Sequence, residues 1–540
     1  MIGRLALILS ASVAAYAQTV VTVQNAASLG AGVPADALAP GSIAAVQTLR
    51  GGPVVINPDP AQLAVKLQPA GGAEMDMPVL GASLGTVLAI VPRAAPVGPA
   101  TVRLINAGQA SQATPVRIVA TSPGLFATGQ GGLGPALAQN ASLGRGLELN
   151  RLTAPALPGD YLVLWGTGLG DARQDEVALE IGGIPAAAAY AGPAPGFPGL
   201  DQINVAVPPD APRGCYVSVL LTVRGAVSNE VTVSNAATSG PCVHPFGLSA
   251  EALQALDEGR QVRLPVANLH SDVAPPPGGA LNNQYTRNEG ATAELAQRSA
   301  FQIALLAQPL KVGAAYYGCR LGSSLSLSSF IAVDDLDAGE RLVLTGPDRS
   351  LDLVRSLPVL YTALVPAPPP VDNPRDLPAP FFNPGLWRLG GAGGATVASL
   401  EASLRLPPPI RWTNRGALAA IDRSAGFTVA WEPDGYSDDD VMTVTLTTGI
   451  FSQALPGTAL ASTVACRAPA SQGQLTMPAD LLQLIPPSPT FPGVGGGTLT
   501  LRLAPLPWRR TRFDLPYVAG GAAPGVFDYL FSEALRTVIR

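Results

Sequence analysis

An internal repeat in the first 242 residues does most to restrict the fold of this chain. The motif Val-Pro-x-x-Ala-Pro-x-Gly begins at Val91 and again at Val207, an offset of 116 residues. Further matches at offsets of 118 and 117 are Pro40-Gly41 with Pro158-Gly159, and Gly108 and Ser111 with Gly225 and Ser228. Chance similarity between two segments rich in proline and glycine is the alternative, and three matched offsets argue against it. We therefore predict two copies of one unit. Each has roughly a hundred residues and about seven short strands, the size of an immunoglobulin-like sandwich.

The shared motif has a direct physical explanation. Its first proline ends an edge strand, its second proline fixes φ, and its glycine supplies the conformation from which the next strand begins. The 59 glycines and 54 prolines of the chain are spread singly between apolar runs, which is typical of short strands joined by tight turns. The sequence therefore predicts an all-β, multi-domain protein: tandem immunoglobulin-like β-sandwiches followed by further β-rich sandwich units.

Length and charge bound the organisation and the partners. A chain of 540 residues is too long for one core, and roughly three to four domains are expected. Charged residues make up 13% of the chain and the net charge is −5. Nucleic acid is disfavoured as a partner, because it requires a dense basic face.

The N-terminus has the pattern of a secretory signal peptide. A short basic segment ends at Arg4, an apolar run covers residues 5–15, and Ala15-Tyr16-Ala17 forms a cleavage site. A membrane anchor is the alternative, but the run is shorter than the ~18 apolar residues that a span requires. The residue directly after the cleavage site is Gln18 and not a cysteine, so no lipid anchor is indicated. We expect residues 1–17 to be removed and the mature chain to be secreted, extracellular or at the cell surface, without a membrane span.

Four cysteines in an exported chain suggest disulfides, and three pairings are open. Cys215 begins one strand and Cys242 lies just beyond the next, and a turn at residues 225–228 makes these strands a hairpin. We favour Cys215–Cys242, which leaves Cys319 with Cys466. A cysteine-based metal site is the alternative, but the chain has no C-x-x-C pair.

The pattern divides the mature chain into four expected domains. Two sandwiches cover residues 18–121 and 122–242, a β-rich domain covers 243–406, and a C-terminal sandwich covers 407–540. In the third, Ser249 is expected to cap a helix over residues 250–258 that stops at Gly259, and residues 301–306 are expected to form a strand. The proline-rich run at 366–384 is either a linker or a loop within one domain, and we favour the loop.

Several short motifs in the first two units carry a resemblance. They are Asn25-Ala26-Ala27-Ser28, Ala39-Pro40-Gly41-Ser42, Ser122-Pro123-Gly124-Leu125-Phe126, Thr167-Gly168-Leu169-Gly170, Ile181-Gly182-Gly183, Gln202-Ile203-Asn204 and Ser228-Asn229. Together they resemble a large family of exported, mostly uncharacterised bacterial proteins with paired domains. The resemblance implies immunoglobulin-like sandwiches of the IPT/TIG type, and it brings no catalytic residues. The first unit departs from the pattern, because its Gln-Ile-Asn strand is replaced by Leu84-Gly85-Thr86.

Residues suited to nucleophilic or metal-assisted catalysis are sparse. The only histidines are His244 and His270, and neither has a second ligand at metal spacing. The HExxH motif and the G-x-S-x-G elbow are both absent, so a Ser-His-Asp hydrolase is disfavoured. We therefore predict no catalytic residues and no cofactor-binding residues.

The densest charge cluster contains Glu432 and a following acidic run. Weak candidates for a Ca²⁺ site are Asp434, Asp438, Asp439 and Asp440, because hard oxygen ligands cluster in this way. The spacing is not that of an EF-hand, and a solvated loop between two strands is the favoured interpretation. A carboxylate pair for glycoside cleavage, such as Glu432 with Asp434, requires separation across a cleft, which neighbours on one strand do not indicate.

Aromatic side chains in the second unit have two interpretations. Tyr161, Trp165, Tyr190 and Phe197 could form a stacking platform for carbohydrate. Their strand spacing favours packing in the core.

These observations predict an exported, non-catalytic protein. Its expected role is extracellular binding, adhesion, or surface or matrix assembly, through loops at the sandwich ends. The expected partner is an extracellular protein or a polysaccharide. The alternative is a secreted carbohydrate-active enzyme or its accessory subunit, with its site in residues 243–540. A cleft with convergent carboxylates there would favour that alternative.

Overall fold

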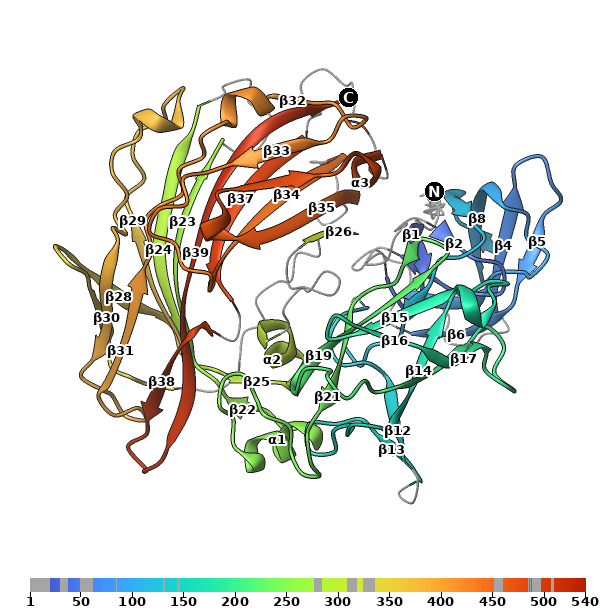
Figure 1. Cartoon of the computed structure of the whole chain (residues 1–540), viewed down its shortest axis with the longest axis horizontal. Coiled ribbons are helices and arrows are strands. Elements are labelled where there is room, and N and C mark those ends of the chain that lie inside the picture. The colour runs from blue at the N-terminus through green and yellow to red at the C-terminus, as the bar shows by residue number, and fades with distance from the viewer. Residues whose placement is uncertain are drawn as a thin grey trace, which may run out of the picture.

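The computed structural model shows an all-β, multi-domain protein (Figure 1). It describes residues 20–29, 37–48, 62–83, 85–129, 132–142, 146–275, 284–307, 318–323, 336–450, 460–483, 485, 487, 497–506 and 509–540. The expected signal peptide, residues 1–17, lies outside these ranges. No helix among the described residues has the length and apolar character needed to cross a bilayer.

The first unit is a sandwich of two sheets around an aliphatic core. One sheet has the order β1 (Val20–Asn25), β3 (Ile43–Thr48), β7 (Thr86–Ile90), β6 (Val79–Ser83). The other has the order β2 (Ala37–Leu38), β10 (Thr114–Ile118), β8 (Gly98–Asn106), β4 (Leu63–Pro69), β5 (Met75–Met77), with β9 (Gln109–Ala110) paired to β8. Alternate residues of these strands, such as Val65 and Leu67 of β4, are buried between the sheets, as period-2 side-chain alternation requires.

The second unit repeats this arrangement with its own core. One sheet has the order β13 (Gly146–Leu149), β12 (Ala138–Ser142), β14 (Tyr161–Thr167), β18 (Asp201–Ala206), β17 (Ala188–Pro193), with β11 (Gly124–Leu125) paired to β14. The other has the order β16 (Ile184–Ala186), β15 (Val177–Ile181), β19 (Gly214–Val223), β20 (Ala226–Val227), with β21 (Val231–Asn235) paired to β19. The separate hydrophobic clusters of the two units fall on either side of residues 121 and 122.

The sequence repeat reappears at the level of individual hydrogen bonds. Ser111 Oγ accepts from Leu104 N at 3.0 Å, and Ser228 Oγ accepts from Leu221 N at 3.0 Å. Each serine hydroxyl also donates 2.8 Å to the carbonyl oxygen of the next residue. The turn before each serine has a non-glycine residue and then a glycine at positive φ: Ala107-Gly108 and Arg224-Gly225. The two copies therefore share a folding unit as well as a composition.

Two buried asparagines join the first unit to the second. Asn25 donates through Nδ2 to the carbonyl oxygen of Ser122 at 2.7 Å, and its Oδ1 accepts from the backbone of its own turn. Asn229 holds Leu125 of its own unit through Nδ2 and Oδ1, at 2.8 Å each, and its Nδ2 also donates 3.5 Å to the carbonyl oxygen of Ala27 in the first unit. A Cβ at Gly168 would lie 1.9 Å from the Ser122 carbonyl oxygen, so only glycine fits there. Motif residues that recur in the resemblance thus form the joint between the sandwiches.

A small helical segment follows the tandem units. Helix α1 (Ala250–Asp257) begins after Ser249, whose side chain accepts from Ala252 N, and Gly259 follows it at φ 79°; the helix predicted from residues 250–258 is confirmed. Helix α2 (Ala300–Ala307) replaces the strand expected at residues 301–306. That prediction is wrong because a short, continuous apolar run has no period that separates a buried strand from a buried helix. Strands β22 (Val262–Arg263) and β25 (Gln297–Arg298) pair beside the helices.

A disulfide lies in the same segment. Cys215 of β19 and Cys242 are bonded and buried, in a cluster with Tyr216, Phe246 and residues of both helices. The hairpin of β19 and β21 brings them together, as the sequence predicts. The cluster packs the second sandwich against the helical segment.

Most strands in the described residues after 265 belong to one 14-stranded sheet. Its order is β26 (Gly318–Ser323), β35 (Leu460–Pro469), β34 (Asp440–Ile450), β37 (Gly497–Pro505), β39 (Ala522–Ile539), β23 (Val266–Ala274), β24 (Thr286–Glu294), β29 (Leu360–Val365), β28 (Ser350–Leu357), β27 (Arg341–Thr345), β30 (Gly385–Gly391), β31 (Leu400–Leu406). Strands β32 (Ala420–Ile421) and β38 (Thr511–Pro516) also pair with β39, while β33 (Phe427–Ala430) and β36 (Gln474–Met477) pair apart from this sheet. Short elements between strands are η3 (Gln174–Glu176), η4 (Pro374–Asp376), η5 (Arg415–Leu418), η6 (Ala470–Gln472) and α3 (Ala479–Gln483).

The large sheet corrects the expected boundary between residues 406 and 407. Strand β39 at the C-terminus pairs in parallel with β23, and one hydrophobic cluster contains residues from Ala267 to Ile539. Residues on both sides of the expected boundary therefore share a sheet and a core. The proline-rich run at 366–384 connects β29 to β30 of this same sheet, so it is a loop within one unit and not a linker.

Candidate functional site

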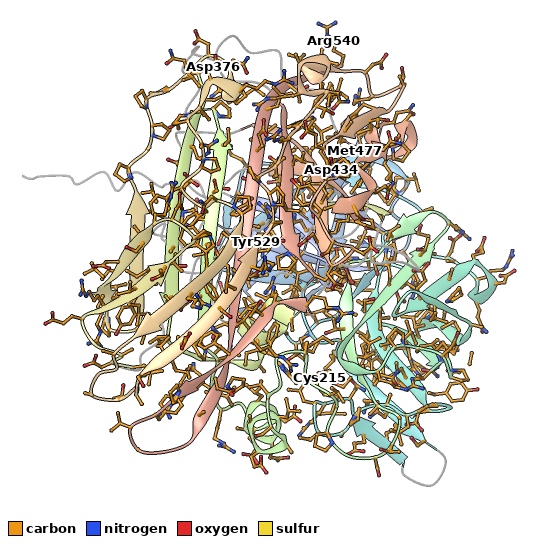
Figure 2. All side chains as sticks on the ribbon, turned by 60° about the vertical axis from the view of Figure 1, so that its left-hand side comes forward. Cys215, Asp376, Asp434, Met477, Tyr529 and Arg540 are labelled. Atoms are coloured by element: carbon orange, nitrogen blue, oxygen red, sulfur yellow. A yellow bond between two sulfur atoms is a disulfide. The ribbon has the colours of Figure 1, made fainter. Side chains whose placement is uncertain are left out.

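A cleft of about 1070 Å³ opens at one end of the large sheet. Asp376 of the proline-rich loop and Arg540 lie at this end in Figure 2. Strands β23, β24 and β39 contribute residues to the cleft, and the rest come from the proline-rich loop, residues 409–419, Tyr285 and Glu432. Its charged lining residues are Arg287, Asp372, Arg375, Arg411, Arg415, Glu432 and Glu533. We call it the arginine cleft.

The proline-rich loop is fixed to the sheet by a buried carboxylate. Glu289 of β24 accepts hydrogen bonds from Phe381 N at 2.8 Å and Phe382 N at 3.3 Å. Phe382 is buried against Trp387, whose Nε1 donates 2.9 Å to the Asn383 carbonyl oxygen. Anchored by side chains of the sheet, the loop forms a defined wall.

The most buried charges of the cleft form an ion pair. Arg415 donates through Nη1 to Glu533 Oε1 and through Nη2 to the carbonyl oxygen of Ala534. The Arg415 guanidinium also lies 4.3 Å from the ring centre of Tyr285 and 5.6 Å from that of Trp412, a geometry that favours cation–π attraction. These contacts hold the Arg415 side chain in one position, and its positive charge is largely neutralised by the Glu533 carboxylate.

Further arginines act on the same carboxylate. Burial raises the pKa of Glu533, while the charge of Arg415 and, more weakly, those of Arg287 and Arg375 lower it. Burial lowers the pKa of the Arg287 guanidinium, which donates to the carbonyl oxygen of Pro378. Three guanidinium groups thus lie within electrostatic range of one buried carboxylate.

The charge balance of the cleft is positive, unlike that of the whole protein. Its lining has four arginines against three carboxylates, whereas the chain has a net charge of −5. At the rim, Arg411 pairs with Glu432 at 3.3 Å, and both side chains are more than half exposed. Arg415 and Arg411 have carboxylate partners. Arg287 and Arg375 therefore supply the positive charge with which a ligand in the cleft can interact.

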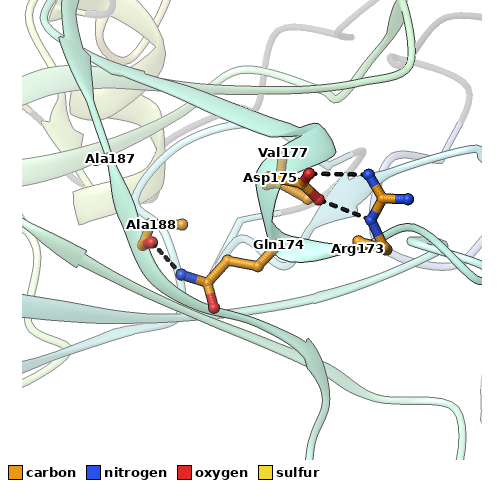
Figure 3. A pocket seen from close by; sticks show the side chains of 6 residues that line it. All are labelled: Arg173, Gln174, Asp175, Val177, Ala187 and Ala188. Atoms are coloured by element: carbon orange, nitrogen blue, oxygen red, sulfur yellow. Dashed lines mark hydrogen bonds and ion pairs between the residues drawn. The ribbon is translucent and has the colours of Figure 1, made fainter.

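A second, shallower hollow lies on the second sandwich. It has a volume of about 510 Å³ and is lined by Arg173, Gln174, Asp175, Val177, Ala187 and Ala188 (Figure 3). Arg173 forms two hydrogen bonds with the Asp175 carboxylate, and Gln174 Nε2 donates 2.7 Å to the Ala188 carbonyl oxygen. Its polar side chains bond to one another or to the backbone.

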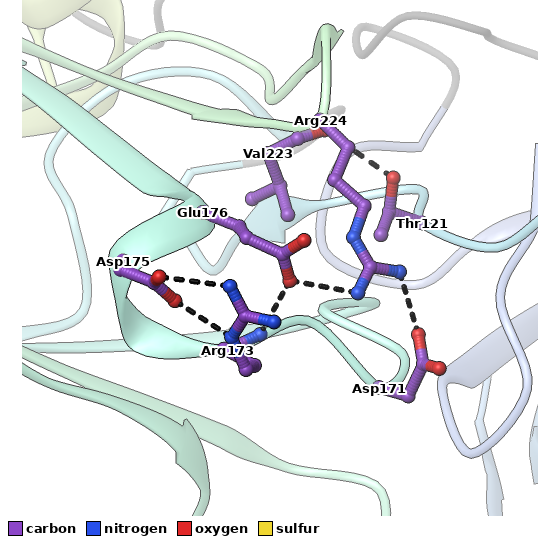
Figure 4. Close-up of polar contacts among 7 residues, drawn as sticks. All are labelled: Thr121, Asp171, Arg173, Asp175, Glu176, Val223 and Arg224. Atoms are coloured by element: carbon purple, nitrogen blue, oxygen red, sulfur yellow. Dashed lines mark hydrogen bonds and ion pairs between the residues drawn. The ribbon is translucent and has the colours of Figure 1, made fainter.

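An exposed ion-pair network adjoins this hollow (Figure 4). Arg224 donates to Asp171 and Glu176 at 2.7 Å each, and the hydrogen bond from Arg224 lowers the pKa of Glu176. Thr121 Oγ1 donates to the carbonyl oxygen of Val223 at 3.3 Å. Exposed pairs of this kind stabilise a fold weakly. We assign this network to holding the loop before β15.

The acidic run does not assemble the suggested Ca²⁺ site in the described part of the chain. Asp438 accepts from Ser471 Oγ, Asp439 pairs with Arg509 at 3.1 Å, and Asp440 accepts from Ser437 and Tyr529. Asp434 is exposed. No three metal-ligating side chains come together among the described residues, because these carboxylates turn to separate partners.

The histidines and the second cysteine pair occupy structural positions. His244 is buried between the rings of Tyr216 and Phe246, and its Nδ1 accepts from Phe246 N at 3.1 Å. His270 lies on β23, opposite Gly290 of β24. Cys319 and Cys466 are directly opposite in the β26–β35 ladder. The side chain of Cys319 is outside the described residues, so a Cys319–Cys466 disulfide stays a prediction.

Four aromatic residues of the second unit were expected to pack in its core, and that prediction is wrong. None of them belongs to the buried cluster between its sheets. Tyr161 is 44% exposed and Phe197 is 62% exposed, while Trp165 and Tyr190 are half-buried. Tyr161, Trp165 and Tyr190 lie on strands but on the face away from the core, and Phe197 lies in the turn between β17 and β18.

Sequence reasoning missed the residues of the arginine cleft. Arg287, Arg415 and Glu533 are separated by more than a hundred residues from one another in sequence, and only the β23–β39 pairing and the residues 409–419 bring them together. A carboxylate and an arginine in such positions give no local pattern.

Comparisons with known proteins establish no family. No family model matches the chain, and no curated protein matches it. Among solved structures, domains 5–6 of the S-layer protein SbsC are similar at 12% identity and TM-score 0.21, over 41% of this chain and 99% of that one. A Bacteroides ovatus mixed-linkage glucan utilization locus protein, SGBP-B, is similar at 10% identity and TM-score 0.16, over 83% and 88%. A tetra-tandem repeat of a large adhesion protein is similar at 13% identity and TM-score 0.12, over 94% and 99%. Likenesses at this level carry no argument about function.

Proposed function

We propose that the protein is an exported, non-catalytic binding protein that works outside the cell, and that its arginine cleft holds an acidic polysaccharide. The observation that carries this proposal is the gathering of Arg287, Arg375 and Arg415 round the carboxylate of Glu533. The sequence pattern of residues 1–17 supports export. Binding, adhesion, or surface or matrix assembly are the roles that such a protein would serve.

The chemistry of the cleft suits carboxylate groups on a chain. A guanidinium presents paired N–H donors that match a carboxylate, and it remains charged at all physiological pH values. The cleft volume of about 1070 Å³ is at the upper end of ligand pockets, which suits a segment of several sugar units. Proline residues of the loop wall, such as Pro374 and Pro378, need little ordering when a ligand binds.

Equilibrium binding of the mature protein to polygalacturonate and to a neutral dextran of similar length tests this proposal. We expect binding to polygalacturonate that weakens as salt rises, because the contacts are ionic. The double variant R287Q/R375Q should lose about tenfold or more in affinity, since each guanidinium–carboxylate contact contributes about 1 kcal/mol or more. Arg388→Gln, at an exposed arginine of β30 in the same sheet, is the matched control. Binding to polygalacturonate that does not weaken as salt rises, or an unaffected double variant, would overturn the proposal.

A secreted carbohydrate-active enzyme is the second candidate, and one observation favours it. Glu533, whose pKa is raised by burial, shares the cleft with Glu432 and Asp372, and glycosidases use two carboxylates of which one has a raised pKa. The ion pair with Arg415 argues against this role, because it stabilises the ionised form of Glu533. A hydrolysis screen of the mature protein with E533Q and E432Q separates the candidates. Turnover that disappears in one of these variants would establish the enzyme.

A further inference from the structure

The outer face of one sheet in the second sandwich carries aromatic rings, amides and no charge. On β14, β18 and β17, the residues that point away from the core are Tyr161, Val163, Trp165, Gln202, Asn204, Ala206, Tyr190 and Gly192. Ile203 and Val205, which alternate with the amides, are buried in the core. None of these outward positions is charged, in a protein with 33 Lys and Arg and 38 Asp and Glu residues.

The strand register sets the rings beside the amides. Gln202 lies between Trp165 of β14 and Gly192 of β17, and Asn204 lies between Val163 and Tyr190. Neighbouring strands are ~4.8 Å apart, so Trp165 and Tyr190 stand on strands about 10 Å apart, on either side of the amides. We call Trp165, Tyr190, Gln202 and Asn204 the aromatic–amide face.

The ring of Tyr190 lies flat along its strand. A Cβ at Gly192 would be 3.2 Å from Tyr190 Oη and 3.5 Å from Cζ, so the ring occupies the space that a side chain at Gly192 would fill. The hydroxyl donates 2.7 Å to the carbonyl oxygen of Pro193, which fixes the ring in this position. Tyr190 is half-buried: one side of its ring rests on the sheet.

The amides are held in one orientation with polar atoms to spare. Gln202 Nε2 donates 2.9 Å to Asn204 Oδ1. Within the described part of the chain, Gln202 Oε1 and Asn204 Nδ2 have no hydrogen-bond partner. One acceptor and one donor are therefore available between two rings, on residues whose side chains are already ordered.

We propose that the aromatic–amide face binds an uncharged polysaccharide chain. Sugar rings offer C–H groups that pack on aromatic faces and hydroxyls that bond to amides, and the absence of charge on this face fits a ligand without charge. The exposed apolar side chains of Tyr161, Leu147 and Leu149, at 44%, 64% and 41% exposure, extend the same face across β12 to β13. This surface is distinct from the arginine cleft in place and in chemistry; Figure 1 shows β14 and β17 on the opposite side of the molecule from the large sheet.

The first sandwich supplies an internal control. The offset of 116 that relates Val91 to Val207 places Thr86 and Leu88 of β7 at the positions of Gln202 and Asn204. Val87 between them is buried, as Ile203 is. The counterpart of the Gln-Ile-Asn strand is therefore Thr86-Val87-Leu88. It overlaps the segment expected from the sequence, Leu84-Gly85-Thr86, only at Thr86. Neither of the residues that replace the amides carries a group equivalent to them.

Affinity electrophoresis of the mature protein through gels that contain xylan, galactomannan or a mixed-linkage β-glucan tests the proposal. We expect retardation by at least one neutral polymer, and we expect the double variant Q202A/N204A to lose about tenfold or more in affinity. The matched variant T86A/L88A changes equivalent positions of the first sandwich and should bind as the wild type does. Polygalacturonate in a separate gel reports the cleft independently.

A second readout guards against a merely structural effect. Ligand should shift the tryptophan emission of the wild type, and W165F should lose that shift while it keeps the wild-type melting temperature. Failure of every neutral polymer to bind, equal losses in Q202A/N204A and T86A/L88A, or an emission shift that survives in W165F would each overturn the proposal. Loss of neutral binding with retained polygalacturonate binding would support it and leave the cleft proposal untouched.

Discussion

His244 should make the contact between the second sandwich and the helical segment sensitive to acid. Its imidazole is 5% exposed, its Nδ1 accepts a hydrogen bond from Phe246 N, and its Nε2 has no partner among the described residues. Burial lowers the pKa of His244 from 6.5 to about 3. The unfolded chain takes up a proton near pH 6.5, whereas the folded chain does not until about pH 3, so protonation favours unfolding between these values.

The magnitude follows from the difference between the two pKa values. One pKa unit corresponds to about 1.4 kcal/mol. At pH 4.5, about two units below the unfolded pKa, His244 should lower the free energy of unfolding by about 2.7 kcal/mol relative to pH 7.5. The loss should reach about 5 kcal/mol by pH 3 and then level off. The stability contributed by the neutral ring is therefore complete above the unfolded pKa and is lost as the pH falls toward the folded pKa of about 3.

The assay compares wild type with His244→Asn. The asparagine side chain is uncharged and retains an oxygen acceptor near the position of Nδ1. Urea unfolding at pH 7.5 and 4.5, read by hydrogen exchange of peptides that cover the Cys242 segment and helix α1, isolates this part of the chain. Wild type should lose about 2.7 kcal/mol more than the variant between the two pH values, and His270→Asn should behave as wild type. Equal losses in wild type and His244→Asn would refute the reasoning.

Three further perturbations have expected outcomes. Burial raises the pKa of Asp201 to about 6, so the protonated carboxyl stabilises the fold at pH values below its usual pKa, and this contribution is lost as the pH rises through 6. Asp201→Asn should therefore raise the free energy of unfolding by about 2–3 kcal/mol at pH 8 but not at pH 4. Calorimetry at both pH values checks this. Arg415→Met leaves Glu533 buried without its partner and should cost about 3–5 kcal/mol, while R415M/E533L should recover most of that loss in urea unfolding. Gly168→Ala places a methyl group 1.9 Å from the Ser122 carbonyl oxygen, and it should expose the joint to limited proteolysis; an unchanged cleavage pattern would show that the joint can shift.

The tandem units and the helix that follows them were predictable because their information is local. The turn at Gly225, the cap at Ser249 and the hairpin that unites Cys215 with Cys242 all depend on residues close in sequence. Turn chemistry and alternation act over a few residues, so they can be read from the chain. The same information was insufficient for residues 301–306, where an apolar run without a period forms a helix.

The candidate sites were harder to predict, for two different reasons. Glu533 and Arg287 meet only because β39 and β24 both flank β23. Tyr190 and Trp165 lie on strands that the alternation locates, but alternation does not say which face another layer will cover. Aromatic residues are usually buried, and here the aliphatic residues Ile203 and Val205 fill the core instead.

By itself, the amino-acid sequence determined that this chain folds into β-strands and tight turns, that its first half contains one unit twice, and that it carries the pattern of an exported protein. Only the tertiary structure decided that strands from β23 to β39 share one sheet, and that arginines from distant segments converge in a cleft. The physical reason is range: turns, caps and alternation are set by neighbours along the chain. Strand order and the choice of the covered face are set by contacts that form only when the whole chain packs.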